Sequence, residues 1–293
     1  MKIDMPAALS FMATHGRILD RRRLQALLGQ TDASDAFAAL DAYRNPDGGY
    51  GWGLEPDLRC AESQPAAAMH ALEVFAENAT TTPRAAELCD WLEAHTLADG
   101  GVPIALPIAD PAGCAPFWAE VDSTISSLQM TSQVAANAHR GARHDPVVAR
   151  HLWLARATEY CLDAIDKIHT MPHAYEFLFS LWFLDAAYES SRGAQALLDR
   201  LGQFLPEHGS ITVDGGTGDE QMHPLDFAPR PGRPIRALFT AEAIEADLKR
   251  LAGMQQPDGG WVVDFGSFSP IAELEWRGYA TVQAVEILRS NAP

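Results

Sequence analysis

Apolar residues recur at spacings of three and four along most of the chain, and runs of β-branched residues are rare. This periodicity predicts α-helices, because residues three and four positions apart share one face of a helix. Clear examples are residues 66–75, 174–184 and 281–288. The segment 174–184 is apolar nearly all round, and we therefore expect it to be buried on most sides.

A short phrase of one aspartate and two glycines occurs three times, each time after a helix-like stretch. Asp47 and Asp99 are 52 positions apart, and Asp99 and Asp258 are 159 apart, which is three steps of 53. A unit of about 53 residues is therefore repeated. Two degenerate copies are expected between the second and third phrases. One is at 207–211, and the other is near residue 152, where no phrase is visible. The glycines predict the left-handed backbone that often ends a helix.

A unit of this length holds two helices, and five or six such hairpins either stack into an open solenoid or close into a barrel. The loops are long and differ from copy to copy, which favours closure. The sequence thus predicts an all-α protein with a single α/α barrel (toroid) domain over residues 1–293. Two irregular segments, 103–118 and 209–236, are expected to cover one end of the barrel, since long loops are often functional.

Composition narrows the classes of partner. The formal net charge is −17 and no long basic run occurs, which argues against nucleic acid. No apolar run reaches the ~18 residues that span a membrane, so we expect a cytoplasmic protein with at most transient contact with a membrane surface. Four scattered cysteines without a Cys-x-x-Cys pair indicate reduced, buried thiols. Oligomeric state does not follow from these features.

The phrase Gln-x-Pro-Asp-Gly-Gly-Trp at 255–261, with its echo at 45–52, resembles the glutamine-tryptophan repeat of terpenoid cyclases and protein prenyltransferases. That superfamily, which includes squalene-hopene-type cyclases, is built on α/α barrels. The resemblance therefore implies the fold that the periodicity predicts, in a single-barrel form, and an enzyme of isomerase or lyase type. In the family the Gln side chain and the Trp ring tie one helix to the next. We expect Gln255 and Trp261 to be braces rather than ligands.

The resemblance also implies an acid motif. Residues 120–124 (Glu-Val-Asp-Ser-Thr) are similar to the Asp-x-Asp-Asp-Thr of proton-initiated cyclases, and a helix is expected over 125–138. Asp122 would be the catalytic proton donor, assisted by Glu120. Such a donor needs a carboxyl that is held neutral by burial and by neighbouring carboxylates. The structural alternative is that Asp122 or Ser123 caps the helix, and the two roles are compatible.

On this interpretation an apolar isoprenoid enters the barrel and aromatic rings stabilise the cation. Arginines would hold a diphosphate, if the substrate carries one, and salt bridges to nearby acids are the alternative role for them. No cofactor or metal is expected, apart from Mg²⁺ with a diphosphate substrate. The substrate-binding candidates are Trp118, Phe117, Trp52, Trp276, Phe227, Arg230, Arg233 and Arg236.

Two other functions remain open. Glycoside hydrolases on α/α barrels use paired carboxylates, and acids follow both the first and the last phrase. The helix macrodipole alone also favours acids at such positions. The chain would otherwise be a non-catalytic binder of apolar ligands. The secondary acid candidates are Glu55, Asp57, Asp226, Glu273 and Glu275.

Overall fold

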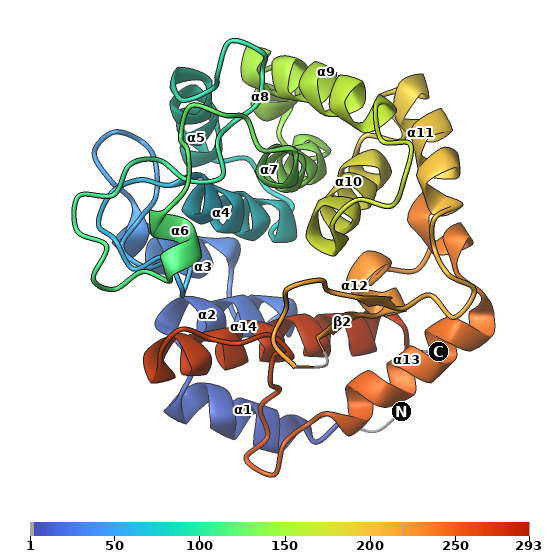
Figure 1. Cartoon of the computed structure of the whole chain (residues 1–293). Helices are drawn as coiled ribbons and strands as arrows, with labels where there is room; N and C mark the ends of the chain where they lie inside the picture. Colours follow the sequence, from blue (N-terminus) through green and yellow to red (C-terminus); the bar gives the residue numbers. More distant parts are fainter. Residues whose placement is uncertain (1–2, 219, 293) are drawn as a thin grey trace. The chain divides into compact units, whose positions relative to one another are not determined.

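The computed structural model describes residues 3–218 and 220–292, and these residues are mostly helical, as the periodicity predicts (Figure 1). They form fourteen α-helices, two short 3-10 helices and one two-stranded antiparallel sheet. The α-helices are α1 (Met5–Thr14), α2 (Ile18–Leu27), α3 (Ala33–Leu40), α4 (Pro65–Glu77), α5 (Pro83–Ala94), α6 (Pro116–Ala119), α7 (Leu128–Ala142), α8 (Pro146–Ala149), α9 (Leu152–Asp166), α10 (Ala174–Ala186), α11 (Arg192–Gly202), α12 (Pro224–Phe227), α13 (Ala241–Gly253) and α14 (Pro270–Ser290). The 3-10 helices span Asp41–Tyr43 and Pro234–Leu238, and the strands are β1 (Ile211–Thr212) and β2 (Gln221–Met222).

Contacts divide the chain into two compact parts. The middle part comprises residues 40–201. The terminal part comprises the residues up to 39 together with those from 202 onward, so the two ends of the chain belong to one part. The expectation of one domain over residues 1–293 stays a prediction.

In the middle part, α4, α7 and α10 lie side by side in chain order (Figure 1). A second row of helices packs against them, in which α5 contacts α4 and α9 contacts α7 and α10. Every residue of the alanine-rich segment 65–72 in α4 is buried. Small side chains let helices approach closely, which suits a central position. On α10, Phe177, Leu181 and Phe183 are fully buried, whereas Tyr175 and Trp182 keep partial exposure. The expectation that this helix is buried on most sides is confirmed.

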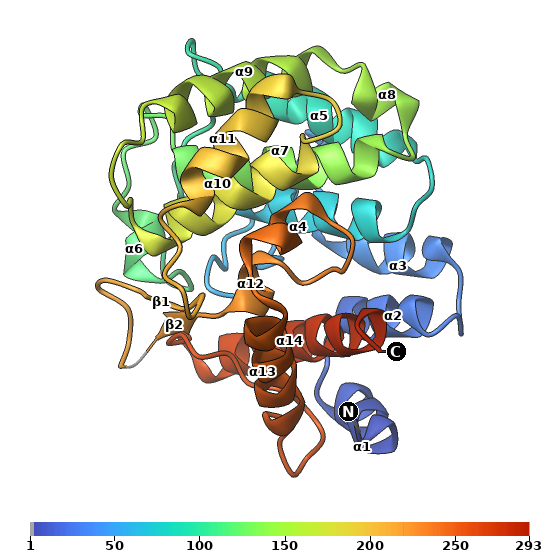
Figure 2. The same cartoon turned by 90° about the vertical axis from the view of Figure 1, so that its right-hand side faces the viewer.

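In the terminal part, α14 packs against α1, α2 and α13 (Figure 2). The shared core contains Phe11 and Met12 of α1, Leu24 of α2, and Val285 of α14. Trp261, which precedes α14, is only 1% exposed in the same core. The first and last helices of the chain are therefore held together by one apolar cluster.

The three aspartate-glycine phrases form the same turn. The carboxylates of Asp47, Asp99 and Asp258 accept the N–H two residues later, at 2.9, 3.2 and 3.1 Å. The intervening glycines have φ of +90°, +96° and +96°, which is the left-handed region that glycine adopts without strain. The expected left-handed glycines are confirmed in all three copies, but they do not end the preceding helices, because α3, α5 and α13 already end at Leu40, Ala94 and Gly253.

One of the two degenerate copies also has this geometry. His208 Nδ1 accepts the N–H of Ser210 at 3.1 Å, and Gly209 between them has φ of +75°. An imidazole nitrogen thus replaces the aspartate oxygen. The copy expected near residue 152 is wrong, because Leu152 begins α9. The arithmetic fails there because the loops between helices differ in length, so the period is not constant.

Each of the three turns packs closely against one further helix. A Cβ added to the first glycine of each phrase would meet a helix carbonyl. At Gly48 this is the Glu87 carbonyl of α5 at 3.3 Å, at Gly100 that of Arg156 in α9 at 3.0 Å, and at Gly259 that of Ala7 in α1 at 2.2 Å. A Cβ on the second glycine would meet the aromatic ring four residues further along the same helix, at 2.6 to 2.8 Å. Those rings are Trp91, Tyr160 and Phe11. The last turn of the chain is therefore completed by its first helix.

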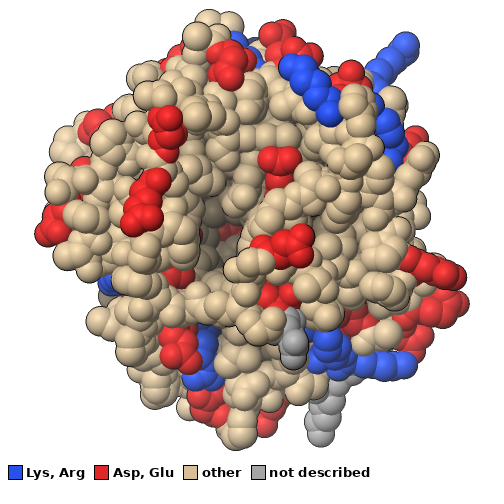
Figure 3. Space-filling model, in the orientation of Figure 1, with Lys and Arg blue, Asp and Glu red and all other residues tan. Residues whose placement is uncertain are grey.

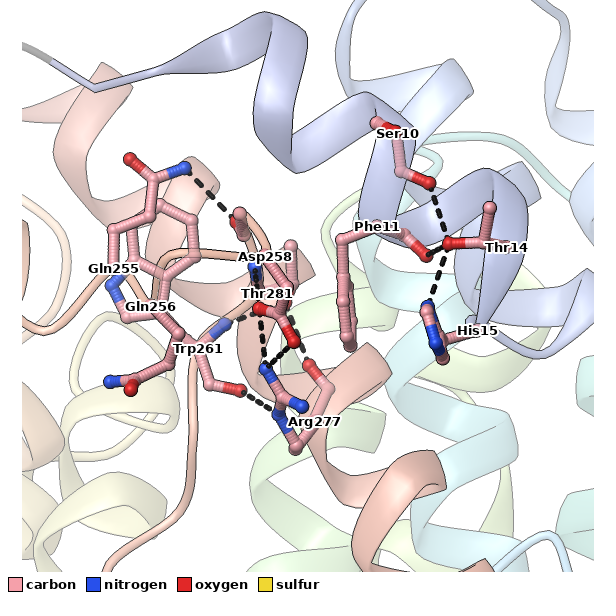
Figure 4. Close-up of polar contacts among 12 residues, drawn as sticks. Ser10, Phe11, Thr14, His15, Gln255, Gln256, Asp258, Trp261, Arg277 and Thr281 are labelled. Atoms are coloured by element: carbon pink, nitrogen blue, oxygen red, sulfur yellow. Dashed lines mark hydrogen bonds and ion pairs between the residues drawn. The ribbon is translucent and has the colours of Figure 1, made fainter.

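Figure 4 shows part of this last turn, including the ion pair of Arg277 with Asp258 at 2.7 Å. Gln255 donates to the backbone carbonyl of Asp4 and accepts the Asp4 N–H, both at 2.9 Å, and Asp4 is the N-cap of α1. Trp261 donates its indole N–H to the Leu251 carbonyl of α13 at 2.8 Å. Gln255 thus ties the end of α13 to the start of α1, and the expectation that both side chains are braces is confirmed.

Candidate functional site

Asp122 does not have the environment of a proton donor. Its side chain is exposed and accepts the backbone N–H and the hydroxyl of Thr124, at 2.9 and 2.6 Å. These hydrogen bonds lower the pKa of Asp122 below its usual value, so its carboxyl is ionised at neutral pH. Glu120 is also exposed, at the end of the short α6. Its exposure and its hydrogen bonds do not support Asp122 as the catalytic acid, and that assignment stays a prediction.

The capping alternative for this segment is wrong in detail. The helix begins at Leu128 rather than Ile125, and its N-cap is Ser127, whose hydroxyl accepts the Met130 N–H at 3.1 Å. Asp122 caps only its own turn. A bond from a side chain to the backbone N–H two residues later forms in a turn without any helix. The residue types at 122–124 therefore fit a turn as well as a helix cap.

The aromatic candidates belong to both compact parts of the chain. Phe117 is 61% exposed, beside the half-buried Trp118 at 5.6 Å between ring centres. Trp52 is 58% exposed and donates its indole N–H to Asn45, so it braces the first turn. In the terminal part, Phe227 is buried against Phe239, and Trp276 lies edge-on to Phe265 and Tyr279.

The arginine candidates fasten their loop to the last helix. Arg230 pairs with Glu286 of α14 at 2.5 Å. Arg236 donates to the Ala228 carbonyl at 2.6 Å and to the side chain of Asn291. Arg233 precedes the second 3-10 helix. Arg230 therefore has the alternative role, a salt bridge to an acid. These contacts do not support a role of the arginines in binding a diphosphate.

Glu55 belongs to a buried network in the middle part. It lies 2.8 Å from His70 Nε2, and Glu73 lies 3.4 Å from His70 Nδ1. Burial alone would lower the pKa of His70, but hydrogen bonds to the two carboxylates raise it above its usual value. Asp57 is also buried and donates its N–H to Glu55. The imidazole is only 4% exposed, so this network braces the start of α4 and leaves little room for a substrate.

Glu273 and Glu275 lie in the first two turns of α14. Glu273 is exposed and Glu275 is half-buried. Their position fits the macrodipole alternative, in which acids stabilise the N-terminal end of a helix.

Asp226 is the one acid candidate with the properties of a proton donor. It lies on α12, where its carboxylate accepts the His223 N–H at 2.6 Å. The pKa of Asp226 is raised to about 7, chiefly by burial and also by the charges of Asp264 and Asp247, while the His223 N–H and Arg250 oppose the shift. A carboxyl with this pKa carries its proton for much of the time at neutral pH.

The groups around Asp226 are polar and come from three segments of the terminal part. His223 precedes α12, and its pKa is lowered by burial and by Arg250 of α13. Asp247 of α13 is buried, accepts the Leu225 N–H at 2.7 Å, and binds Arg250 Nε at 2.5 Å. Asp264 follows the third turn. We refer to His223, Asp226, Asp247, Arg250 and Asp264 as the Asp226 cluster.

The Asp226 cluster is open to solvent. Asp226 and His223 are half-buried and Asp264 is exposed. Crowding by protein nevertheless raises the pKa of Asp264 above its usual value. Asp226 and Asp264 are thus both crowded by protein and within reach of solvent, as a group that acts on a substrate must be.

Only Asp226 of this cluster was among the candidates. A signal for Asp247 exists in the sequence, because it falls three residues after Ile244 and four before Leu251, on the apolar stripe of α13. A carboxylate on such a stripe is buried and therefore needs partners. Asp264 has no such signal, since it lies in an irregular segment.

No group of three or more potential ligands for a metal ion occurs among residues 3–218 and 220–292. No helix in the described part of the chain has the length and apolarity needed to cross a membrane.

One surface hollow of about 450 Å³ lies in the middle part, and its lining includes none of the candidates. Figure 3 shows Asp and Glu side chains scattered over one face, in keeping with the acidic composition.

Comparisons with known proteins bear on the fold alone. No protein-family model matches the chain, and no curated protein sequence matches it. A solved structure described as a protein from Actinoplanes is similar, with a TM-score of 0.54 and 14% sequence identity over 92% of this chain and 89% of that one. At this identity the similarity concerns the helical fold and says nothing of activity.

Proposed function

We propose that the chain forms an α/α barrel of six helical hairpins. Taken in chain order, the pairs are α1 with α2, α3 with α4, α5 with α7, α9 with α10, α11 with α12, and α13 with α14. Three observations support this. The turns within three of these pairs are alike, each packs against the first helix of the next pair, and the last turn packs against α1. An open solenoid has no reason to join its last unit to its first.

We further propose that the protein is an acid-base enzyme with Asp226 as the general acid. The observation that carries this is the half-buried Asp226 carboxyl, which keeps its proton near neutral pH beside a second, solvent-exposed carboxylate, Asp264. A carboxyl whose pKa is raised toward neutral pH is a common feature of general-acid catalysis.

The reaction class that suits this site is hydrolysis of a glycosidic bond. Asp226 gives its proton to the departing oxygen, and Asp264 takes a proton from the attacking water. His223 and Arg250 supply further polar groups for a hydroxyl-rich substrate. A carbocation cavity, in contrast, is lined by ring faces, and the Asp226 cluster is polar.

The second candidate is proton-initiated cyclisation of an isoprenoid, now with Asp226 in the place of Asp122. The braced Gln255 and Trp261 favour it, since they lie as the resemblance to the glutamine-tryptophan repeat implies. The same bonds also stabilise any protein built from this repeat, so they support the architecture more than the chemistry.

The test compares wild type with Asp226→Asn and with Asp122→Asn, which makes the same substitution at an exposed site. Each protein is incubated with neutral and acidic oligosaccharides, and separately with geranyl, farnesyl and geranylgeranyl diphosphates and squalene. We expect cleavage of a saccharide by wild type and Asp122→Asn, and a loss of at least about 100-fold in Asp226→Asn. Cyclic products from the isoprenoids would select the second candidate. Equal turnover by wild type and Asp226→Asn would refute the role of Asp226 in either reaction.

A further inference from the structure

Asp247 is a buried carboxylate that contacts two elements of the Asp226 cluster. Its side chain is 3% exposed and lies on α13. One oxygen accepts the backbone N–H of Leu225, the residue before Asp226, at 2.7 Å. The other oxygen accepts Arg250 Nε at 2.5 Å. Neither bond is to Asp226 itself.

The hydrogen bond to Leu225 holds α12 against α13. This helix has four residues, so its own backbone bonds constrain it weakly. Pinning the N–H of Leu225 leaves the next residue little freedom to rotate. The position of the Asp226 carboxyl therefore depends on Asp247.

The bond to Arg250 places a guanidinium near the acid. Arg250 is held through Nε by Asp247 and through Nη1 by Met254 Sδ at 2.7 Å, and its positive charge lowers the pKa values of Asp226, His223 and Asp264. The charged and titratable groups that act on Asp226 are thus Asp247 and Arg250 of α13 and Asp264 of the loop after the third turn, with the His223 N–H as a donor. Glu220, which is buried near Asp264, acts on that residue.

We infer that the Asp247–Arg250 pair is a positioning element, which fixes the Asp226 carboxyl and sets the pH at which it gives up its proton. This inference rests on the proposed role of Asp226. The pair does not touch the reacting atoms. Its effect passes through the backbone of α12 and through its charges.

The experiment measures the pKa of Asp226 directly, by a ¹³C NMR titration of its side-chain carboxyl, and hydrogen exchange at the Leu225 amide. Neither measurement needs a substrate, so both can succeed when every activity assay fails. The variants are Asp247→Asn and, as the matched control on the same helix, Glu245→Gln. Glu245 is exposed and pairs only locally, with Lys249.

We expect Asp247→Asn to lower the pKa of Asp226 by roughly one pH unit, because a neighbouring negative charge is lost. Exchange at Leu225 should become at least about tenfold faster, since a weaker acceptor holds its amide. Glu245→Gln should change neither. Where activity is measurable, its alkaline limit should move to lower pH in Asp247→Asn, because the acid loses its proton earlier.

An unchanged pKa of Asp226 in folded Asp247→Asn would overturn the inference. If that variant does not fold, Arg250→Gln takes its place. It removes a neighbouring positive charge and should raise the pKa of Asp226 while Leu225 stays protected. A pKa that does not move in Arg250→Gln would overturn the inference equally.

Discussion

Replacing Gly259 by alanine should destabilise the protein much more than the same change at other left-handed glycines. Gly259 has φ of +96°, and an added Cβ would lie 2.2 Å from the Ala7 carbonyl of α1. The obstacle is helix backbone, so no side-chain rotation relieves it. The whole of α1 must move away from the third turn.

The magnitude follows from a comparison of three glycines. Gly215 has φ of +75° and open space around it, so alanine there costs only backbone strain, about 1 kcal/mol. Gly48 has φ of +90° and a Glu87 carbonyl at 3.3 Å, which adds a small contact cost, for about 1 to 2 kcal/mol in total. Gly259 adds a backbone overlap and should cost about 3 to 4 kcal/mol.

The assay is urea or thermal unfolding of the three single variants, followed by circular dichroism, with limited proteolysis to detect release of α1. Cleavage near the α1–α2 junction should rise in Gly259→Ala alone. Equal destabilisation by Gly259→Ala and Gly215→Ala would refute the conclusion that the last turn is completed by the first helix.

Three further outcomes follow from the same contacts. Gln255→Ala should cost about 1 to 3 kcal/mol and also loosen α1, measured by the same unfolding and proteolysis, because Asp4 loses both of its bonds to the amide. Thr131→Val and Thr281→Val should each lower the free energy of unfolding in urea by a similar amount, about 1 to 3 kcal/mol. The reason is that each hydroxyl accepts the buried N–H of the residue after the second glycine of its turn. A cost at one site only would contradict the equivalence of the two copies. Asp226 has a folded pKa of about 7 against 3.8 as the ordinary value, so its favourable contribution is complete below pH 4 and is lost as pH rises through 7. Asp226→Asn should therefore gain stability relative to wild type between pH 5 and pH 8, by about 2 to 3 kcal/mol after allowance for its partial exposure, and a constant difference in urea midpoints would contradict the raised pKa.

Several local features were predictable from the sequence because they depend on neighbours in the chain. The left-handed glycines at 48, 100 and 259 follow from the aspartate-glycine phrase, which forms its bonds within three residues. The helical character of α4, α10 and α14 follows from apolar spacing. The bracing role of Gln255 was implied by a resemblance, and the partner Asp4 lies 251 positions away.

The acid site was predictable only in part. Asp122 matched a pattern of residue types, but a pattern does not report exposure, and two hydrogen bonds from Thr124 lower its pKa. Asp226 was one acid among several, and its pKa is raised mainly by burial and also by Asp264 and Asp247, which are 38 and 21 positions further along the chain. Proton affinity is a property of surroundings, and the surroundings of a side chain are assembled by folding.

The sequence by itself determined that this chain is helical, that it repeats, and where its glycine turns lie, because helix periodicity and turn chemistry act over a few residues. Only the tertiary structure decided that α1 completes the last turn and that burial and neighbouring charges raise the pKa of Asp226. Both depend on groups distant in the chain, whose approach is selected by packing and burial rather than by local sequence.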